Sequence, residues 1–242
     1  MAITRLQSPI PRVRPLKVQD LRWPTTPLRV LAAPMHPGGV DVFHVLNGRR
    51  TDRHFRRLSE RSLSTFLWYS ARTRFAYVDA SGRRFESKPA PSAGGCHPHD
   101  LLIIRPGRGG LEASVYDSRA HALAKLRCQT AALRRFVRHV ADAVRPEQGT
   151  IVWLLAQPQR TENHYHFPES LLWRDAGALI GIMAVVADSL NLAFCPVGAT
   201  GDPHITRLFR TRQDAYGFGG AILGGRVASR STIARSMRLQ AS

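Results

Sequence analysis

The chain has 242 residues, of which 35 are Lys or Arg and 17 are Asp or Glu, so its formal net charge at pH 7 is +18. This length is enough for one large domain with a substantial core, and 43% hydrophobic residues exclude wholesale disorder despite the charge. Only three basic residues are lysine, and the arginines are spread along the whole chain. Nucleic-acid binders usually mix both types on one face, so nucleic acid is disfavoured as a partner.

The cysteines and the apolar runs indicate the compartment. Cys96, Cys128 and Cys195 are far apart, odd in number and match neither a disulfide framework nor a metal spacing. We therefore expect a reducing, cytoplasmic location and no metal. The longest apolar run, residues 176–186, is too short for a bilayer of about 30 Å, so we expect no membrane association. The proline-rich start lacks the apolar core of a secretion signal.

The pattern of apolar residues, Pro and Gly predicts the elements in chain order. Residues 1–39 are expected to form a Pro- and Arg-rich arm with little regular structure, residues 40–228 a folded domain, and residues 229–242 a basic tail. The expected helices are one that starts near Thr51 or Asp52 and others over 57–72, 119–144 and 171–194. The expected strands are a hairpin over 75–85 and single strands over 101–104, 113–116, 150–156 and 219–224. Helices and strands intermix without strict alternation, which favours the α+β class.

Four segments have compositions that suit ligand binding. The sequence Arg-Arg-Thr-Asp-Arg-His-Phe over residues 49–55 combines guanidinium groups with a hydroxyl near an expected helix start, a combination that suits a phosphate. The sequence Pro-Ser-Ala-Gly-Gly-Cys-His-Pro over residues 91–98 would let the backbone approach a flat ligand closely. A glycine loop over 195–202 and a strand that ends at Arg226 complete the set. Each segment alone is also compatible with an ordinary turn, cap or edge strand.

The order of these segments resembles the FMN-dependent nitroreductase superfamily, over about residues 45–227. Residues 49–55 resemble its Arg-Arg-Ser-x-Arg-x-Phe start. Residues 91–98 resemble the Pro-Ser-Ala-Gly motif of one branch, the peptide azoline dehydrogenases. Residues 110–116 resemble the strand that follows, and residues 174–181 resemble the start of its core helix.

The resemblance implies a nitroreductase-like central mixed or antiparallel sheet flanked by helices, in an intertwined homodimer with FMN at the subunit interface. It implies that Arg49, Arg50, Thr51 and Arg53 hold the FMN phosphate and ribityl chain, with Arg226 returning to the phosphate. The residues implied around the isoalloxazine ring are Ser92, Ala93 and Gly94 on one part and Val197, Gly198 and Ala199 on the other.

The sequence departs from the family pattern at the expected catalytic pair. The azoline dehydrogenases carry a Lys-Tyr pair before the core helix, whereas this chain has His164 followed by Tyr165. A neutral His accepts a proton near neutral pH and a Tyr donates or relays one, so this pair can serve. The alternative is that both side chains pack or cap beside the helix.

The implied activity is FMN-dependent oxidation of thiazoline or oxazoline rings to azoles in a ribosomally made, modified precursor peptide, beside a cyclodehydratase partner. Two alternatives stay open. One is another FMN oxidoreductase, such as an NAD(P)H-dependent nitro or quinone reductase. The other is a non-catalytic nitroreductase-like partner subunit.

Overall fold

The computed structural model describes residues 6–17, 19–34, 38–107, 109–209 and 215–227. Its helices are α1 Val42–Gly48, α2 Glu60–Ala71, α3 Thr130–Ala143, α4 Pro158–Glu162, α5 Glu169–Ser189 and α6 His204–Leu208, with one 3-10 turn, Ala93–Gly95. Its strands are β1 Ile10–Pro11, β2 Thr25–Val30, β3 Phe55–Arg56, β4 Phe75–Val78, β5 Arg84–Ser87, β6 His99–Gly107, β7 Gly110–Asp117, β8 Ala122–Leu126, β9 Thr150–Ala156, β10 Tyr165–His166, β11 Leu192–Val197 and β12 Gly217–Arg226.

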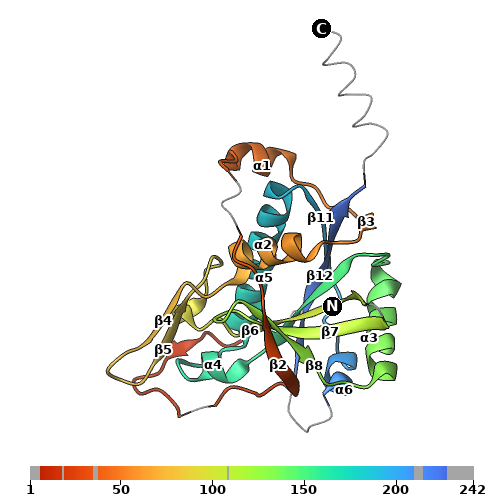
Figure 1. Ribbon diagram of the computed structural model, residues 1–242. Coiled ribbons are helices and arrows are strands. Elements are labelled where there is room, and N and C mark those ends of the chain that lie inside the picture. Colours follow the sequence, from red (N-terminus) through yellow and green to blue (C-terminus); the bar gives the residue numbers. More distant parts are fainter. Residues whose placement is uncertain (1–5, 18, 35–37, 108, 210–214, 228–242) are drawn as a thin grey trace.

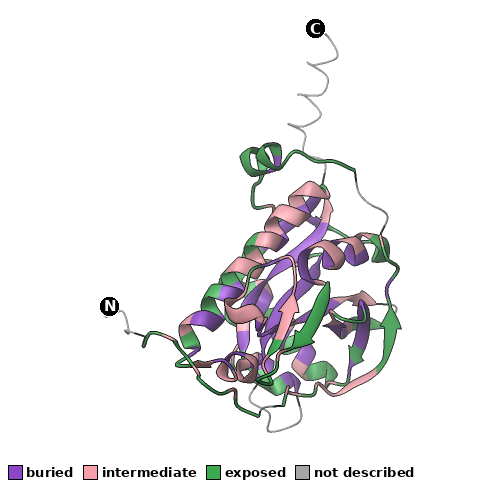
Figure 2. Cartoon of the chain, turned by 90° about the vertical axis from the view of Figure 1, so that its left-hand side faces the viewer, coloured by how far each residue is buried: buried purple, intermediate pink, exposed green. Residues whose placement is uncertain are grey.

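An eight-stranded sheet in the order β11-β12-β9-β6-β7-β8-β2, with β3 beside β12, forms the centre of the molecule (Figure 1). The pairings between its described strands are antiparallel. Every residue of β9 is buried because the strand has neighbours on both sides and helices on both faces, and Figure 2 shows buried residues concentrated at the centre of the molecule. The α+β class and the antiparallel sheet flanked by helices are thereby confirmed.

The side chains of the central strands alternate between two cores, as the pleat of a strand requires. In β9, Ile151 and Trp153 face the core beneath α3 and α6, whereas Val152 and Leu154 face the core beneath α2 and α5. Trp153 is fully buried. Helix α5 is long and apolar enough to cross a membrane, but Met183 and Ala187 on its inner side are fully buried in the second core. The inner side of α5 therefore packs in the core, whereas most of its other residues are only partly buried or exposed.

Periodicity located most elements. Helix α2, the β4–β5 hairpin and the strands β6, β7, β9 and β12 confirm their predictions. The expected helix start at Thr51 is wrong, because α1 begins earlier, where Asp41 Oδ1 accepts from the backbone N–H of Phe43 (3.0 Å). The expected helix over 119–144 is wrong in its first part, which forms β8 between β7 and β2. The helix expected over 171–194 ends at Ser189, and the last residues of that range, 192–194, belong to strand β11.

The N-terminal arm lies against the domain and contains two short strands, more regular structure than the sequence indicates. Strand β2 forms the edge of the main sheet beside β8, and β1 pairs with β10. The backbone N–H of Arg12 donates to the carbonyl of His164 (2.8 Å). The expected tail over 229–242 lies outside the described residues, and the division into arm, domain and tail stays a prediction.

Candidate functional site

The loop over residues 92–98, which connects β5 to β6, is anchored on helix α5. Ser92 Oγ and the backbone N–H of Ala93 both donate to the carboxylate of Asp175, and the backbone N–H of His97 donates back to Ser92 Oγ (2.9 Å). Burial raises the pKa of Asp175. Gly94 and Gly95 have φ values of 58° and 61°, which glycine adopts without strain. The glycines therefore let the chain make this tight turn.

Tyr165 and His164 meet this loop at Gly94. A Cβ placed on Gly94 would lie 2.9 Å from Tyr165 Oη and 3.4 Å from His164 Nδ1, so a larger residue has no space there. Tyr165 is the first residue of β10, and His164 directly precedes it. The arm strand β1 pairs with β10 and holds this segment in place. The structure thus brings together Ser92, Ala93 and Gly94 with the two residues expected to be catalytic.

The protonation of His164 follows from its contacts. Its Nε2 lies 3.1 Å from the backbone carbonyl of Arg84, which can only accept, so the ring proton sits on Nε2 and Nδ1 is left as an acceptor toward Gly94. Burial lowers the pKa of His164, and the bond to Arg84 offsets this only in part. Burial raises the pKa of Tyr165, with Cys96 and Asp175 adding to the effect. At neutral pH the pair is a neutral base beside a protonated phenol.

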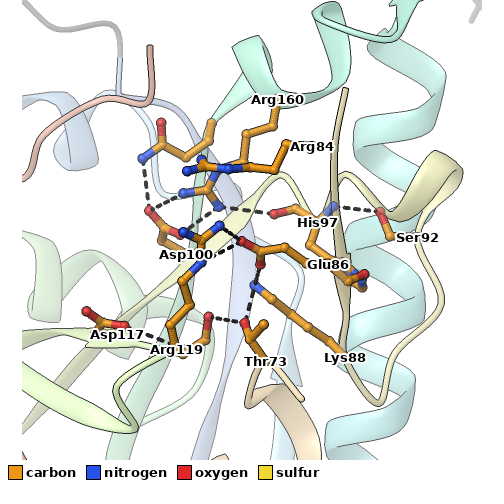
Figure 3. Close-up of polar contacts among 12 residues, drawn as sticks. Thr73, Arg84, Glu86, Lys88, Ser92, His97, Asp100, Asp117, Arg119 and Arg160 are labelled. Atoms are coloured by element: carbon orange, nitrogen blue, oxygen red, sulfur yellow. Dashed lines mark hydrogen bonds and ion pairs between the residues drawn. The ribbon is translucent and has the colours of Figure 1, made fainter. Parts of the chain in front are cut away.

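A group of buried charges, which no sequence motif indicates, holds the other side of the loop (Figure 3). Arg160 on α4 donates to Asp100 Oδ1 (2.9 Å), to Asp20 Oδ2 (3.0 Å) and to the carbonyl of His97 (3.1 Å). Asp100 also accepts from Trp23 Nε1 (2.7 Å). Burial raises the pKa of Asp100, but Arg160 and the hydrogen bonds lower it by more. The net pKa is therefore below its usual value, and the carboxyl is ionised at neutral pH. The arm, β6 and α4 are joined to the loop through one guanidinium.

A second ion cluster lies beside it. Glu86 contacts Lys88 Nζ (3.0 Å) and accepts from Arg119 Nε (2.9 Å). Burial raises the pKa of Glu86, but Lys88 and Arg119 together lower it to about 2. Its backbone carbonyl lies 2.9 Å from His97 Nε2. His97 is therefore held by ring, N–H and carbonyl at once.

The arginine cluster, Arg49, Arg50 and Arg53, lies in a different part of the molecule. These side chains are exposed, and no ion pair to another described residue is present. The segment passes β11, where the N–H of Asp52 donates to the carbonyl of Phe194 (3.1 Å). It reaches β3, where Phe55 is paired with Arg226. Thr51 is exposed in the same stretch, which is not a helix start.

Arg226 is less available to a phosphate than the sequence implies. Its guanidinium pairs with Asp188 at the end of α5 and donates from Nη1 to Asn191 (3.3 Å). Its Nε is buried and has no partner among the described residues. This side chain anchors β12 to α5, and only its Nε lacks a partner among the described residues.

The arginine cluster and the 92–98 loop lie at opposite ends of the sheet. Strand β12 runs from Gly217, opposite Leu155, to Arg226, opposite Phe55. The 92–98 loop enters β6 at the Leu155 end, since Asp100 is also paired with Leu155. A strand of this length spans about 30 Å. In Figure 1, α1, which precedes the arginine cluster, lies at the top, and the β4–β5 hairpin, which precedes the 92–98 loop, lies at the lower left.

The third expected segment, 195–202, is a loop only in its second part, because residues 195–197 are the end of β11 and pair with β12. Val197 is buried and paired with Gly220, whereas Gly198 is exposed and a Cβ placed on it would meet open space. Ala199 packs partly into the core beneath α3. One chain therefore does not bring the arginine cluster, the 92–98 loop and residues 197–199 to one point. No group of three or more metal-ligating side chains occurs within the described parts of the chain.

No protein-family model and no curated protein matches the sequence. Several solved structures, in contrast, are similar to the chain in fold. A protein of Ralstonia eutropha described as a nitroreductase is 17% identical, with a TM-score of 0.58 over 89% of this chain and 99% of that one. The E. coli microcin synthetase McbBCD, bound to truncated pro-MccB17, is 16% identical with a TM-score of 0.53, over 83% and 79%. A Desulfovibrio desulfuricans protein described as a nitroreductase in complex with FMN is 14% identical with a TM-score of 0.50, over 80% and 93%.

At these identities the likeness defines the fold. The chain has the nitroreductase-like fold that the order of its motifs implies.

Proposed function

We propose that this protein is an FMN-dependent dehydrogenase that oxidises azoline rings to azoles in a modified peptide. The observation that carries the proposal is the convergence of His164 Nδ1, Tyr165 Oη and Gly94 at the 92–98 loop. The nitroreductase-like fold and the azoline-dehydrogenase motif over residues 91–98 support it, and so does the likeness to a microcin synthetase complex with a peptide bound.

The residues present fit FMN. Residues 92–95 are only partly buried, so a flat ring can approach their backbone, and Gly198 leaves open space at the edge of the sheet. The exposed arginine cluster suits a phosphate. In this assignment the ring lies on Ser92, Ala93 and Gly94 of one subunit. The phosphate end lies on the arginine cluster and Thr51 of another, because one chain separates these groups by the length of β12. A homodimer is therefore part of the proposal.

FMN supplies a two-electron acceptor for the hydride that leaves the azoline carbon. The chain's own residues supply the proton chemistry. His164 Nδ1 accepts the proton from the neighbouring ring carbon, since it is neutral and unpartnered toward the loop. Tyr165 Oη, which keeps its proton, donates a hydrogen bond to the heteroatom of the ring and orients it. Asp175 accepts a hydrogen bond from Ser92 and so fixes the loop against which the flavin ring would lie.

We further propose that the enzyme works in the cytoplasm beside a cyclodehydratase that forms the azoline. The test has two stages. Purified protein is first examined for the absorption band of an oxidised flavin, and an azoline-bearing peptide is then followed by mass spectrometry. Loss of a pair of hydrogens per ring is expected, and bound FMN without this loss would rule out the azoline assignment.

The catalytic pair is tested separately. Tyr165→Phe and His164→Gln are expected to retain FMN and to lose turnover by about a hundredfold or more, the range of general acid–base catalysis. Full activity in both variants would place the base elsewhere. Rapid NAD(P)H consumption with a nitroaromatic instead would favour a reductase.

A further inference from the structure

The β4–β5 hairpin carries an aromatic face. Phe75 is paired with Ser87 and Tyr77 with Phe85, and directly opposed residues project on the same side of a sheet. The rings of Tyr77 and Phe85 are stacked, with centroids 5.0 Å apart and an interplanar angle of 15°. Phe75 and Tyr77 are 62% and 55% exposed. Much of the apolar surface on this side of the hairpin therefore faces solvent.

This face lines a hollow that opens onto the 92–98 loop. The hollow measures about 320 Å³, and its lining includes Phe75, Tyr77 and Phe85 from the hairpin and Ser92 and Gly95 from the loop. Gly95 lies directly on β5, since a Cβ there would be 3.3 Å from the carbonyl of Glu86. The aromatic face and the proposed flavin-lining loop thus form neighbouring walls of one depression.

Phe85 connects this hollow to the catalytic pair. Its ring meets the ring of His164 edge to face, with centroids 5.2 Å apart. His164 and Tyr165 in turn lie against Gly94. An azoline ring at His164 and Tyr165 is therefore separated from Tyr77 by the single side chain of Phe85. Successive residues of an extended peptide are about 3.3 Å apart, so a neighbour of the oxidised ring reaches Phe85 and Tyr77.

The charges around the hollow decide which side chain it suits. Arg74 donates to the carbonyl of Lys88 (2.9 Å), Arg83 to the carbonyl of Arg12, and Arg84 to Asp20 (3.2 Å). Lys88 is paired with Glu86. Arg84 and Lys88 are thus ion-paired, whereas Arg74 and Arg83 bond only backbone carbonyls. None of these three arginines lines the hollow, and Lys88, which does, is already paired, so an acidic side chain would find no free cation in its wall. An apolar or aromatic side chain gains the most from it.

We propose that the aromatic face of the hairpin, Phe75, Tyr77 and Phe85, is the subsite for an apolar or aromatic residue of the substrate peptide, next to the azoline that is oxidised. The inference rests on the proposed function and names the part of the peptide that the enzyme selects. Within the described chain β4 pairs with β5 alone, so its outer edge is also open to the backbone of an extended peptide. The hairpin projects from the body beside the site, as Figure 1 shows.

The experiment measures binding without requiring turnover. A fluorescein-labelled peptide with Phe beside a thiazole, the stable product ring, is titrated with flavin-loaded protein and followed by anisotropy. A matched peptide has Ser in place of Phe. Wild type is expected to bind the Phe peptide about tenfold more tightly, equivalent to 1.4 kcal/mol. Tyr77→Ala is expected to abolish this preference, and Tyr77→Phe, which keeps the stack, is expected to retain it.

Val78→Ala is the matched control, because Val78 is an adjacent exposed residue of β4 that projects on the opposite side of the hairpin. It should change neither affinity. In steady-state assays Tyr77→Ala should raise KM with kcat unchanged, as expected for binding lost equally from ground and transition states. FMN content should equal that of wild type in all variants.

Three outcomes overturn the subsite. A preference for Phe that survives in Tyr77→Ala, or is lost equally in Val78→Ala, would remove the hairpin face from peptide selection. Loss of FMN in Tyr77→Ala would assign the face to the flavin. Conversion of a dimer to a monomer in that variant would assign it to the contact between copies. If the peptides discriminate as expected but no azoline is oxidised, the proposed function fails while the subsite stands.

Discussion

Replacing Arg160 by Met tests the buried charges that fix the 92–98 loop. The substitution keeps most of the side-chain volume and removes the guanidinium. Arg160 and Asp100 are 14% and 17% exposed, so their ion pair is largely out of water. Removing one member of a buried pair typically costs 3–5 kcal/mol, because the remaining charge is left uncompensated.

The expected value lies at the lower end of this range. Asp100 keeps two donors when Arg160 is lost, Trp23 Nε1 (2.7 Å) and Gln157 Nε2 (2.9 Å). Asp20, 31% exposed, keeps Arg84 (3.2 Å). We therefore expect Arg160→Met to lower the free energy of unfolding by about 3 kcal/mol at pH 7. The measurement is urea unfolding of the flavin-loaded protein, in which the midpoint should fall with an unchanged m value.

The pH dependence of the loss identifies its cause. In the wild type the pKa of Asp100 is lowered, so its ionised form contributes stability above the unfolded pKa of about 3.9 and loses it as the pH falls through the lower folded value. Without Arg160, burial dominates and raises that pKa. The variant then takes up a proton on folding, and its deficit relative to wild type should shrink between pH 7 and pH 5. Asp100→Asn in the Arg160→Met background should recover part of the stability.

Two results would refute this reasoning. One is a loss below about 1 kcal/mol, which is the size of an exposed pair. The other is strict additivity of Arg160→Met and Asp100→Asn, which would show that the two side chains do not share an interaction.

Three further outcomes are expected. Because the pKa of His164 is lowered from 6.5, kcat/KM should be constant from neutral pH down to about 6.5 and fall only below it, and His164→Gln should remove that acid limb; a limb of unchanged position in the variant would contradict the assignment. Gly94→Ala should lower the free energy of unfolding by about 1–3 kcal/mol and impair turnover, because φ is 58° and the new Cβ meets Tyr165. The control Gly39→Ala meets nothing within 4 Å and should leave the free energy of unfolding in urea unchanged. If two chains pack through α5, Gly181→Arg, which points into open space in one chain, should yield a monomer in light scattering and release FMN; a fully dimeric variant would place the contact elsewhere.

The elements that periodicity located are those in which local pattern and tertiary burial agree. In α2 the apolar spacing coincides with a buried stripe that includes Leu63, Phe66 and Leu67, and Ser59 caps its first turn. Strand β8, Ala122–Leu126, is the opposite case. Its Ala, Leu and Lys residues favour a helix, but pairing with β7 and β2 decides its structure.

The site was predictable where its residues are adjacent in sequence. The 92–98 loop and the pair His164 and Tyr165 each occupy one short segment, and in the structure the pair lies against Gly94 of the loop, although their roles stay a prediction. The Asp20–Arg160–Asp100 cluster is assembled from residues as much as 140 positions apart. No spacing rule connects such residues, because their contact exists only once the arm lies against α4. Asp175 lies within a segment that resembles a family motif, but only the folded structure shows that it holds Ser92.

The excess of positive charge also gains a structural explanation for some of its members. The arginines that form ion pairs within the described fold include Arg29, Arg84, Arg105, Arg119, Arg160 and Arg226. With 35 basic and 17 acidic residues, more than half of the basic side chains have no acidic residue to pair with, so an arginine without an ion pair does not by itself indicate a site.

What distinguishes Arg49, Arg50 and Arg53 is their position. They lie on the segment that leads into β3, beside β11 and Arg226. Strand β12, about 30 Å long, runs between the end of the sheet at the arginine cluster and the end at the 92–98 loop, and this length exceeds that of an extended flavin mononucleotide. If both segments bind one FMN, they must come from different chains. This separation is therefore the structural reason why the proposed function includes a homodimer.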